Sequence, residues 1–162
     1  MSTYKIEAID SLAATVRDLR AGGKRVVFTN GCFDLLHKGH IELFRAAREH
    51  GDVLVVAINS DESVRRLKGP GRPVFDQSER AEVLIAMEPV DFVCVFDEDT
   101  PLETIVKIHP DVLVKGSDWV DKGIVGQEEV EAWGGEVVVV PLIAGQSSTG
   151  VVERVLSHLG KS

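Results

Sequence analysis

One stretch of the sequence decides the fold: Thr29-Asn30-Gly31-Cys32-Phe33-Asp34-Leu35-Leu36-His37-Lys38-Gly39-His40. An apolar, β-branched run at 26–28 precedes it, and an apolar pattern with helical spacing begins at Ile41. These flanks predict a strand, then a tight turn that contains glycine, then the start of a helix.

His37 and His40 stand where this helix is expected to begin. Residues three apart share one face of a helix, so both imidazoles can point at the same small ligand. Gly39 has no side chain, which lets a ligand approach the backbone. The first turn of a helix also offers unpaired N–H groups and the positive end of the helix dipole, and both favour a phosphate. The stretch therefore predicts an anion site with two imidazole donors.

Two other interpretations of the histidine pair were weighed. A zinc site would need a third protein ligand and usually an HExxH spacing, and the remaining histidines (His50, His109 and His158) form no cluster in the sequence. Alternatively, both histidines simply cap the helix and pack. Two histidines that flank a glycine directly after a strand favour the functional interpretation.

Length and composition fit one globular protein of ordinary apolar content. The chain has 162 residues, and we expect an N-terminal helical extension at 1–23 and a single globular unit at 24–162. The formal net charge of −8 argues against a nucleic-acid-binding surface. No apolar run is long enough to span a membrane, and the N-terminus lacks a signal-peptide core.

The two cysteines, Cys32 and Cys94, do not suggest a disulfide framework. A reducing cytoplasm is the simplest setting for such a chain. We interpret Cys32 as a small buried side chain rather than as a nucleophile, since the residue types next to it in the sequence include no base except His37.

The rest of the chain alternates between strand and helix patterns. Strands are expected at 25–30, 53–59, 91–96, 111–115 and 136–140, and helices at 10–21, 40–50, 61–67, 77–87, 101–108, 126–133 and 149–159. This alternation predicts an α/β fold, a Rossmann-like doubly wound parallel sheet of five strands with helices on both faces and an additional N-terminal helix. Such sheets bind ligands beyond the carboxyl ends of the strands, where the strand order reverses.

A basic loop, Lys68-Gly69-Pro70-Gly71-Arg72-Pro73, interrupts this otherwise acidic chain. It is either a solvated surface turn or a mobile loop whose cations close over a polyphosphate, and we favour the second. Asp76 and Glu79 then predict a capped helix start. Arg80 lies on the first turn of this helix. It forms either a structural salt bridge or a contact with nucleotide phosphates.

Two later segments follow predicted strands and so face the same edge of the sheet. The first, Lys115-Gly116-Ser117-Asp118-Trp119, has the composition of a substrate pocket, with Asp118 for hydroxyl groups and Trp119 as a wall. The second, 145–150, places Ser147, Ser148 and Thr149 at the start of the last helix, where they predict a second anion site.

The sequence also resembles a known family. The pattern Gly31-x-Phe33-Asp34-x-x-His37-x-Gly39-His40 resembles the HxGH signature of the cytidylyltransferase-like nucleotidyltransferases. The whole string TNGCFDLLHKGH is similar to heptose-1-phosphate adenylyltransferases, whose domain occurs alone or fused to a sugar kinase. The basic loop and the lysine-glycine-x-aspartate segment are similar to those enzymes as well. Segment 145–150 resembles the ISSTxI signature that holds the terminal phosphates, although Gln146, Gly150 and Val151 depart from it.

This resemblance, which covers roughly residues 24–156, implies transfer of AMP from ATP to D-glycero-manno-heptose 1-phosphate. It implies Mg²⁺ bridged by phosphates rather than held by a protein metal site. The partners would be ATP and a sugar 1-phosphate, not nucleic acid or a membrane, and a second copy of the chain is a candidate partner. Two alternatives stay open: a cytidylyltransferase for glycerol 3-phosphate or a related alcohol phosphate, and a nucleotide-binding sensor without chemistry.

The expected site residues fall into three groups. The catalytic group is His37, His40 and Lys115. The nucleotide-binding group is Thr29, Asn30, Gly31, Phe33, Asp34, His37, Gly39, His40, Lys68, Arg72, Arg80, Ser147, Ser148 and Thr149. The sugar-phosphate-binding group is Asp34, Lys115, Gly116, Asp118 and Trp119.

Overall fold

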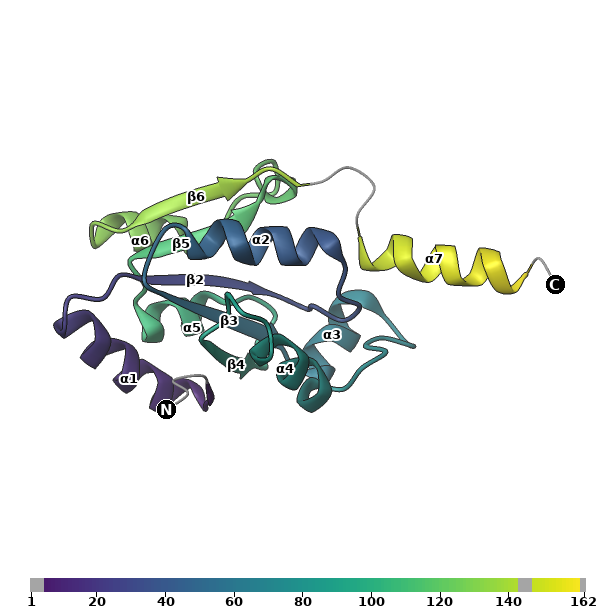
Figure 1. Cartoon of the computed structure of the whole chain (residues 1–162), viewed down its shortest axis with the longest axis horizontal. Helices are drawn as coiled ribbons and strands as arrows, with labels where there is room; N and C mark the ends of the chain where they lie inside the picture. Colours follow the sequence, from purple (N-terminus) through teal and green to yellow (C-terminus); the bar gives the residue numbers. More distant parts are fainter. Residues whose placement is uncertain (1–4, 143–146, 161–162) are drawn as a thin grey trace.

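The computed structural model describes residues 5–142 and 147–160 and shows a parallel sheet between two layers of helices (Figure 1). Its strands are β1 (Lys5–Ile6), β2 (Val26–Gly31), β3 (Val53–Asn59), β4 (Phe92–Phe96), β5 (Val112–Gly116) and β6 (Glu136–Val140). Its helices are α1 (Ile9–Ala21), α2 (Lys38–Arg48), α3 (Asp61–Lys68), α4 (Gln77–Ile85), α5 (Leu102–Ile108), α6 (Gln127–Ala132) and α7 (Ser148–Leu159), with a short 3-10 turn, η1 (Ser117–Trp119).

The strand order, β1-β4-β3-β2-β5-β6, confirms the doubly wound parallel sheet. From β2 the chain adds β3 and β4 toward one edge, then crosses to the opposite side of β2 to add β5 and β6. The order therefore reverses between β2 and β5. In sheets of this kind, a ligand crevice opens at that point, beyond the carboxyl ends of the strands.

Strand β2 is buried on both faces, which explains its continuous apolar run. Val27 packs toward the layer that contains α2 and α4, in a cluster with Phe44 and Leu84. Val26 and Phe28 point the opposite way, toward the layer formed by α1, α5 and α6. Because the side chains of a strand alternate between faces, three consecutive apolar residues serve both cores.

The expectation of five strands was wrong by one, since the sheet has a sixth strand, β1, at its edge. Lys5 pairs with Phe92 and Ile6 with Val93. A strand of two exposed residues carries no periodicity, so the sequence pattern gave no signal for it. The N-terminal helix α1 is present as expected and buries Leu12 in the core between α1 and the sheet.

Helix α7 extends away from the two layers (Figure 1). None of its described residues is fully buried, and Val155 and Leu156 are more than half exposed. The hydroxyl of Ser148 donates to the carbonyl of Leu35 over 3.1 Å, which fixes the start of the helix against the turn after β2. Gly145 and Gln146, which the sequence grouped with this helix start, lie outside the described residues.

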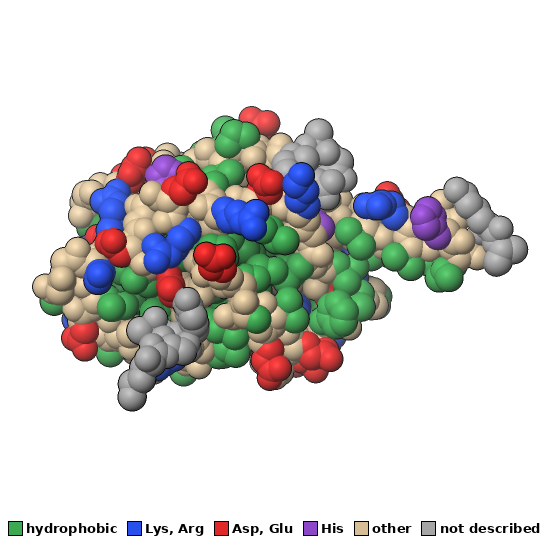
Figure 2. All heavy atoms as spheres, in the orientation of Figure 1, with side chains coloured by type: hydrophobic (Ala, Val, Ile, Leu, Met, Phe, Trp, Pro, Cys, Tyr) green, Lys and Arg blue, Asp and Glu red, His purple; other side chains and the backbone are tan. Residues whose placement is uncertain are grey.

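On the face seen in Figure 2, side chains of both charges are interspersed over the helices. In 5–142 and 147–160, none of the helices combines the length and the apolar character needed to cross a lipid bilayer.

Phe28 gives a direct measure of how strongly the central strand holds the sheet. We expect Phe28→Ala to lower the free energy of unfolding by about 3–5 kcal/mol, because a fully buried ring is replaced by a cavity. Urea denaturation measures this loss. Val83→Ala, on the exposed side of α4, is the matched control and should stay within about 0.5 kcal/mol of the wild type. Equal stabilities of the two variants would contradict the packing described for β2.

Candidate active site

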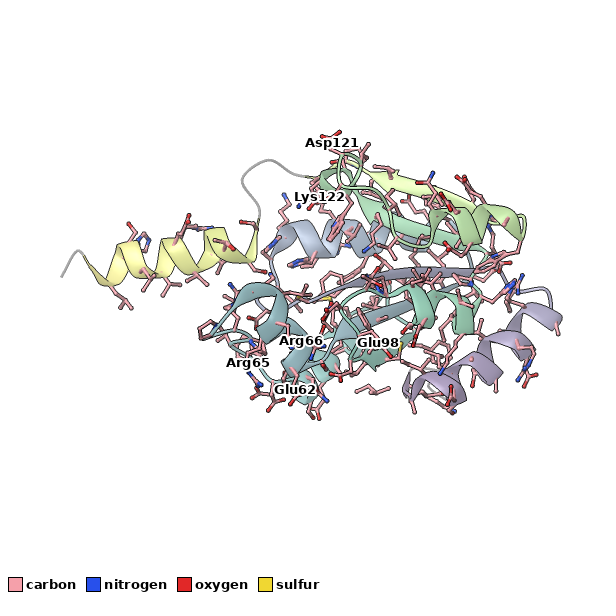
Figure 3. The ribbon with its side chains drawn as sticks, turned by 180° about the vertical axis from the view of Figure 1, so that it is seen from behind. Glu62, Arg65, Arg66, Glu98, Asp121 and Lys122 are labelled. Carbon is pink, nitrogen blue, oxygen red and sulfur yellow. The ribbon has the colours of Figure 1, made fainter. Side chains whose placement is uncertain are left out.

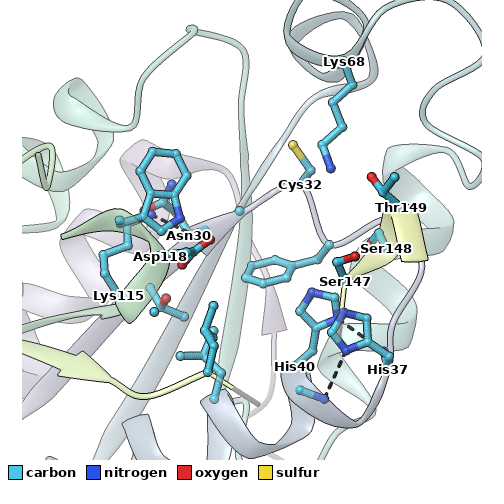
Figure 4. A pocket seen from close by; sticks show the side chains of 18 residues that line it. Asn30, Cys32, His37, His40, Lys68, Lys115, Asp118, Ser147, Ser148 and Thr149 are labelled. Atoms are coloured by element: carbon cyan, nitrogen blue, oxygen red, sulfur yellow. Dashed lines mark hydrogen bonds between the residues drawn. The ribbon is translucent and has the colours of Figure 1, made fainter. Parts of the chain in front are cut away.

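A cavity of about 290 Å³ lies at the carboxyl ends of β2 and β5, where the strand order reverses (Figure 4). It unites the turn after β2, the end of β5 with η1, the end of α3 and the start of α7. Its lining residues are Thr29, Asn30, Gly31, Cys32, Phe33, His37, Gly39, His40, Leu43, Lys68, Lys115, Gly116, Asp118, Trp119, Leu142, Ser147, Ser148 and Thr149.

The turn after β2 is shaped by Gly31 and Phe33. Phe33 adopts a left-handed backbone conformation with φ of 45°, which is strained for a residue with a bulky side chain. Its ring folds back over Gly31, where an added Cβ would lie 2.9 Å from the ring. The same ring meets His40 edge-on, with 5.3 Å between ring centroids. The turn therefore fixes the orientation of His40 by direct packing.

His37 and His40 form a reciprocal cap at the start of α2. The N–H of Gly39 donates to Nδ1 of His37 over 3.1 Å, and the N–H of His37 donates to Nδ1 of His40 over 3.3 Å. Because Nδ1 accepts in both rings, a neutral imidazole must carry its proton on Nε2. The cap itself thus fixes two Nε2–H donors on stacked rings whose centroids are 3.9 Å apart.

The pKa values of both histidines favour these neutral forms. Burial lowers the pKa of His37, and burial together with the nearby His37 and Lys68 lowers the pKa of His40 to about 4. Both rings are therefore uncharged near neutral pH, and they act on a ligand as hydrogen-bond donors rather than as cations.

Lys115 is the buried cation of the cavity, with 4% of its surface exposed. Its Nζ donates to the carbonyl of Asn30 over 3.4 Å and lies 4.9 Å from the centre of the Trp119 ring. Burial lowers the pKa of Lys115 to about 8, although the carboxylate of Asp118 acts in the opposite direction. One long hydrogen bond leaves donor capacity on this ammonium group, which an anionic ligand can use.

Two polar side chains next to Lys115 are also available to a ligand. Thr29 Oγ1 and Asn30 Oδ1 are buried and have no hydrogen-bond partner within the described part of the chain. Buried polar groups are normally paired, so unpaired ones on a cavity wall indicate that a bound molecule completes them.

The wall opposite the histidines is built by Gly116, Asp118 and Trp119. An added Cβ at Gly116 would lie 2.8 Å from Leu142 and 2.9 Å from the Asp118 carboxylate, so this position has no room for a side chain. The Trp119 ring is 40% exposed and also has Lys122 over it, at 5.2 Å from its centre. The indole is thereby held as a flat surface between two cations.

The start of α7 brings its hydroxyl groups to the cavity, as the sequence predicts. The N–H of Gly150 donates to Ser147 Oγ, which caps the helix, and the proton of the Ser148 hydroxyl is directed to Leu35. Within 5–142 and 147–160, the Thr149 hydroxyl has no hydrogen-bond partner, so it and the helix N-terminus are available to a ligand. Together with α2, two helix N-termini point into one cavity, and both favour negative charge.

Lys68 brings the charge of the basic loop to the cavity, where it lines the wall near Cys32 (Figure 4). Arg66, which is close to it in the sequence, does not join it. Its Nε donates to Asp99 over 2.8 Å. Arg66 lies near Glu62 and Glu98, where α3 approaches the loop after β4 (Figure 3).

Three residues expected to contact ligand, Asp34, Arg72 and Arg80, are not among the described residues that line the cavity. Asp34 and Arg72 form a buried ion pair with an Nε–Oδ2 distance of 2.9 Å. The Arg80 side chain has no exposed surface and donates to Asp61 over 2.8 Å. Each of these charges is paired inside the protein, and of the two roles expected for Arg80 the structure shows the salt bridge.

The sequence interpretation overlooked Leu43 and Leu142, and it did not assign Cys32 to the cavity. Leu43 lies three residues after His40 on α2, so helical spacing alone could have identified it. Leu142 follows β6, and nothing in its sequence context marks it. Burial raises the pKa of the Cys32 thiol, and its Sγ lies 3.7 Å from Asn59 Oδ1. The expectation of a buried side chain was wrong, because Cys32 is only half-buried and lines the cavity.

Comparison with known proteins agrees with this geometry. The bifunctional protein HldE from Trichlorobacter lovleyi is 49% identical over 157 residues, covering 97% of this chain and 32% of that protein. HldE from Geotalea uraniireducens is 52% identical over 154 residues, covering 95% of this chain and 31% of that protein. The chain thus spans about a third of the length of these curated relatives.

A solved structure is similar in both fold and sequence. The crystal structure of the lipopolysaccharide core biosynthesis protein from Thermoplasma volcanium superimposes with a TM-score of 0.60 at 28% identity. The match covers 75% of this chain and 98% of that one. Residues 28–152, from the middle of β2 into α7, match the family model described as Cytidylyltransferase-like. This match spans the histidine turn, the end of β5 and the start of α7, and the chain therefore belongs to the Cytidylyltransferase-like family.

Proposed function

We propose that this chain transfers AMP from ATP to D-glycero-manno-heptose 1-phosphate, which yields ADP-heptose and pyrophosphate. The product would serve the synthesis of lipopolysaccharide or a related cell-envelope glycan, and the reaction would take place in the cytoplasm, where ATP is available. The similarity to HldE proteins over nearly the whole chain supports this choice of reaction.

The observation that carries the proposal is the composition of one cavity. Two Nε2–H donors, two lysines and a hydroxyl-bearing helix N-terminus surround it, and they come from segments as far apart in the sequence as His37 and Thr149. A triphosphate that occupied this cavity would meet donors along its whole length. A site with this composition favours catalysis by positioning and by stabilisation of charge.

In the reaction, a phosphate oxygen of the sugar phosphate attacks the α-phosphorus of ATP, and the bond from that phosphorus to the bridging oxygen breaks. Pyrophosphate leaves with the electron pair. His37 and His40 donate through Nε2–H to the α-phosphoryl oxygens as negative charge builds on them. Lys68, Thr149 and the N-terminus of α7 hold the β- and γ-phosphates.

The acceptor lies on the side of the cavity formed by β5 and η1. Lys115 binds its phosphate and so holds the attacking oxygen in place. Asp118 accepts hydrogen bonds from sugar hydroxyl groups, and Trp119 provides a flat surface for the sugar ring. A sugar with several hydroxyl groups uses this wall more fully than a short alcohol phosphate does.

The metal ion is proposed to be Mg²⁺, bound with ATP. Within the described residues no three His, Cys, Asp or Glu side chains are grouped so that they could hold a metal. The cavity presents hydrogen-bond donors, which fit phosphate oxygens rather than a cation, so Mg²⁺ would enter with the triphosphate and need few protein ligands. When bound, it would neutralise charge on the triphosphate.

A pyrophosphate-release screen over ATP, CTP, GTP and UTP with sugar and alcohol phosphates tests the proposal. We expect release with ATP and a heptose 1-phosphate, and the two anomers are assayed separately. Preferential turnover of CTP with glycerol 3-phosphate would instead favour a cytidylyltransferase for an alcohol phosphate. Nucleotide binding without release from any pair would indicate a sensor.

Removal of either imidazole should slow the chemical step. We expect His37→Ala and His40→Ala each to lower kcat by about 10²–10³-fold, because each removes a preorganised donor to developing charge. Steady-state kinetics measure this loss, while the affinity for ATP changes little. His158→Ala, on the exposed part of α7, is the control. Near-normal turnover of a variant that lacks both imidazoles would contradict the mechanism.

The acceptor affinity should depend on the protonation of Lys115. Its pKa of about 8 means that the ammonium charge is present below pH 8 and is lost above it. We therefore expect kcat/KM for the sugar phosphate to fall by about tenfold per pH unit above pH 8. Lys115→Arg keeps its charge throughout, so this fall should disappear in that variant. The same fall in both proteins would assign the titration to another group.

A further inference from the structure

Asp34 is a buried carboxylate whose oxygens are both already occupied. Its side chain has no exposed surface. The backbone N–H of Phe75 donates to Oδ1 over 3.0 Å, the N–H of Val74 donates to Oδ2 over 2.8 Å, and Arg72 Nε donates to Oδ2 over 2.9 Å. Burial raises the pKa of Asp34, but these donors outweigh it and hold the pKa below its ordinary value. Asp34 is therefore an ionised group that faces protein donors.

These contacts connect two segments that both supply residues to the cavity. Asp34 stands in the turn after β2, three residues before His37. Its donors all belong to 72–75, the far end of the loop that begins after Lys68 at the end of α3. Gly69 and Gly71, with φ of 88° and 85°, allow the chain to reverse between Lys68 and Arg72.

Arg80 holds the same two segments from the other side. Its guanidinium group donates to the carbonyl of Cys32 over 2.7 Å and to the carbonyl of Phe75 over 3.0 Å. The start of the histidine turn and the end of the basic loop are thus joined by an anion at Asp34 and by a cation at Arg80. Lys68, which directly precedes this loop at the end of α3, lines the cavity wall.

We propose that Asp34 is a positioning residue that fastens the loop 69–75 to the histidine turn and so places Lys68 for nucleotide binding. Asp34 acts through Lys68 and does not contact the substrate. This inference rests on the proposed function, in which Lys68 binds the terminal phosphates. An asparagine at this position would keep the shape but would present an amide NH₂ to donors that need an acceptor.

A double-mutant cycle tests this coupling. ATP affinity is measured by calorimetry without acceptor for the wild type, Asp34→Asn, Lys68→Met and the double variant. We expect each single substitution to weaken ATP binding by about tenfold, the effect of one lost charge-assisted contact. The double variant should bind no more weakly than the weaker single variant, because both changes remove the same contact. If the fold-losses of ATP affinity in the two single variants multiply in the double variant, the proposal is overturned.

Hydrogen exchange at the amides of Val74 and Phe75 gives a second readout. A substitution that merely destabilised the whole protein would not accelerate exchange at these two amides alone. We expect faster exchange at these amides in Asp34→Asn, with little change in the central strands. If Asp34→Asn does not fold, Arg72→Met keeps the carboxylate and its two backbone donors and removes one contact. It should weaken ATP binding in the same direction, again without adding to Lys68→Met; unaltered ATP binding by this variant would overturn the proposal.

Asp99→Asn is the matched control, since it breaks an exposed aspartate–arginine pair with Arg66 outside the cavity. It should leave ATP affinity unchanged. The test also separates this inference from the proposed function. If the wild-type protein binds none of the four nucleoside triphosphates, both the proposed function and this inference are overturned. If it binds ATP but the effects of Asp34→Asn and Lys68→Met on the binding free energy simply add, only the role of Asp34 is overturned.

Discussion

The site depends on how β2 is paired with its two neighbours. On one side, β2 stays in register with β3 from Val26 to Gly31. On the other, its ladder with β5 runs through Val27 and Phe28, although both strands continue beyond it. The two strands therefore separate toward their carboxyl ends, and Lys115 crosses the gap to reach the carbonyl of Asn30. The cavity is this separation, placed where the strand order reverses.

The cavity wall carries more positive than negative charge, which favours an anionic ligand. The chain carries a net charge of −8, yet among the described residues the cavity wall gathers Lys68, Lys115 and two helix N-termini around one carboxylate, Asp118. Neutral imidazoles suit this environment better than imidazolium ions would, because they donate hydrogen bonds without adding to the repulsion between buried cations. Lys115 forms no ion pair within 5–142 and 147–160, although the nearby Asp118 carboxylate acts to raise its pKa. The polyphosphate of the proposed function would add negative charge beside it.

The sequence predicted the features that depend on local pattern. Buried strands gave continuous apolar runs, and the strand–turn–helix order placed His37 and His40 correctly on the cavity wall. The sequence could not predict the ion pairs of Asp34, Arg72 and Arg80, because their partners lie far along the chain. The same charged residues would suit a phosphate site equally well. Arg80 shows the difficulty: its guanidinium group donates hydrogen bonds to four residues from three segments, and only the packing of the fold shows that it faces inward. The short strand β1 gave no pattern at all.

The histidine turn combines two kinds of residue that a sequence motif cannot separate. Gly31 and Phe33 shape the backbone, Asp34 holds the neighbouring loop, and His37 and His40 face the cavity. A match to the motif therefore indicates an architecture in which the cap of α2 presents two donors to one cavity. The opposite wall of the cavity belongs to a different segment, 115–119, at the end of β5 and in η1. In the proposed function this second segment, rather than the histidine turn, would contact the acceptor.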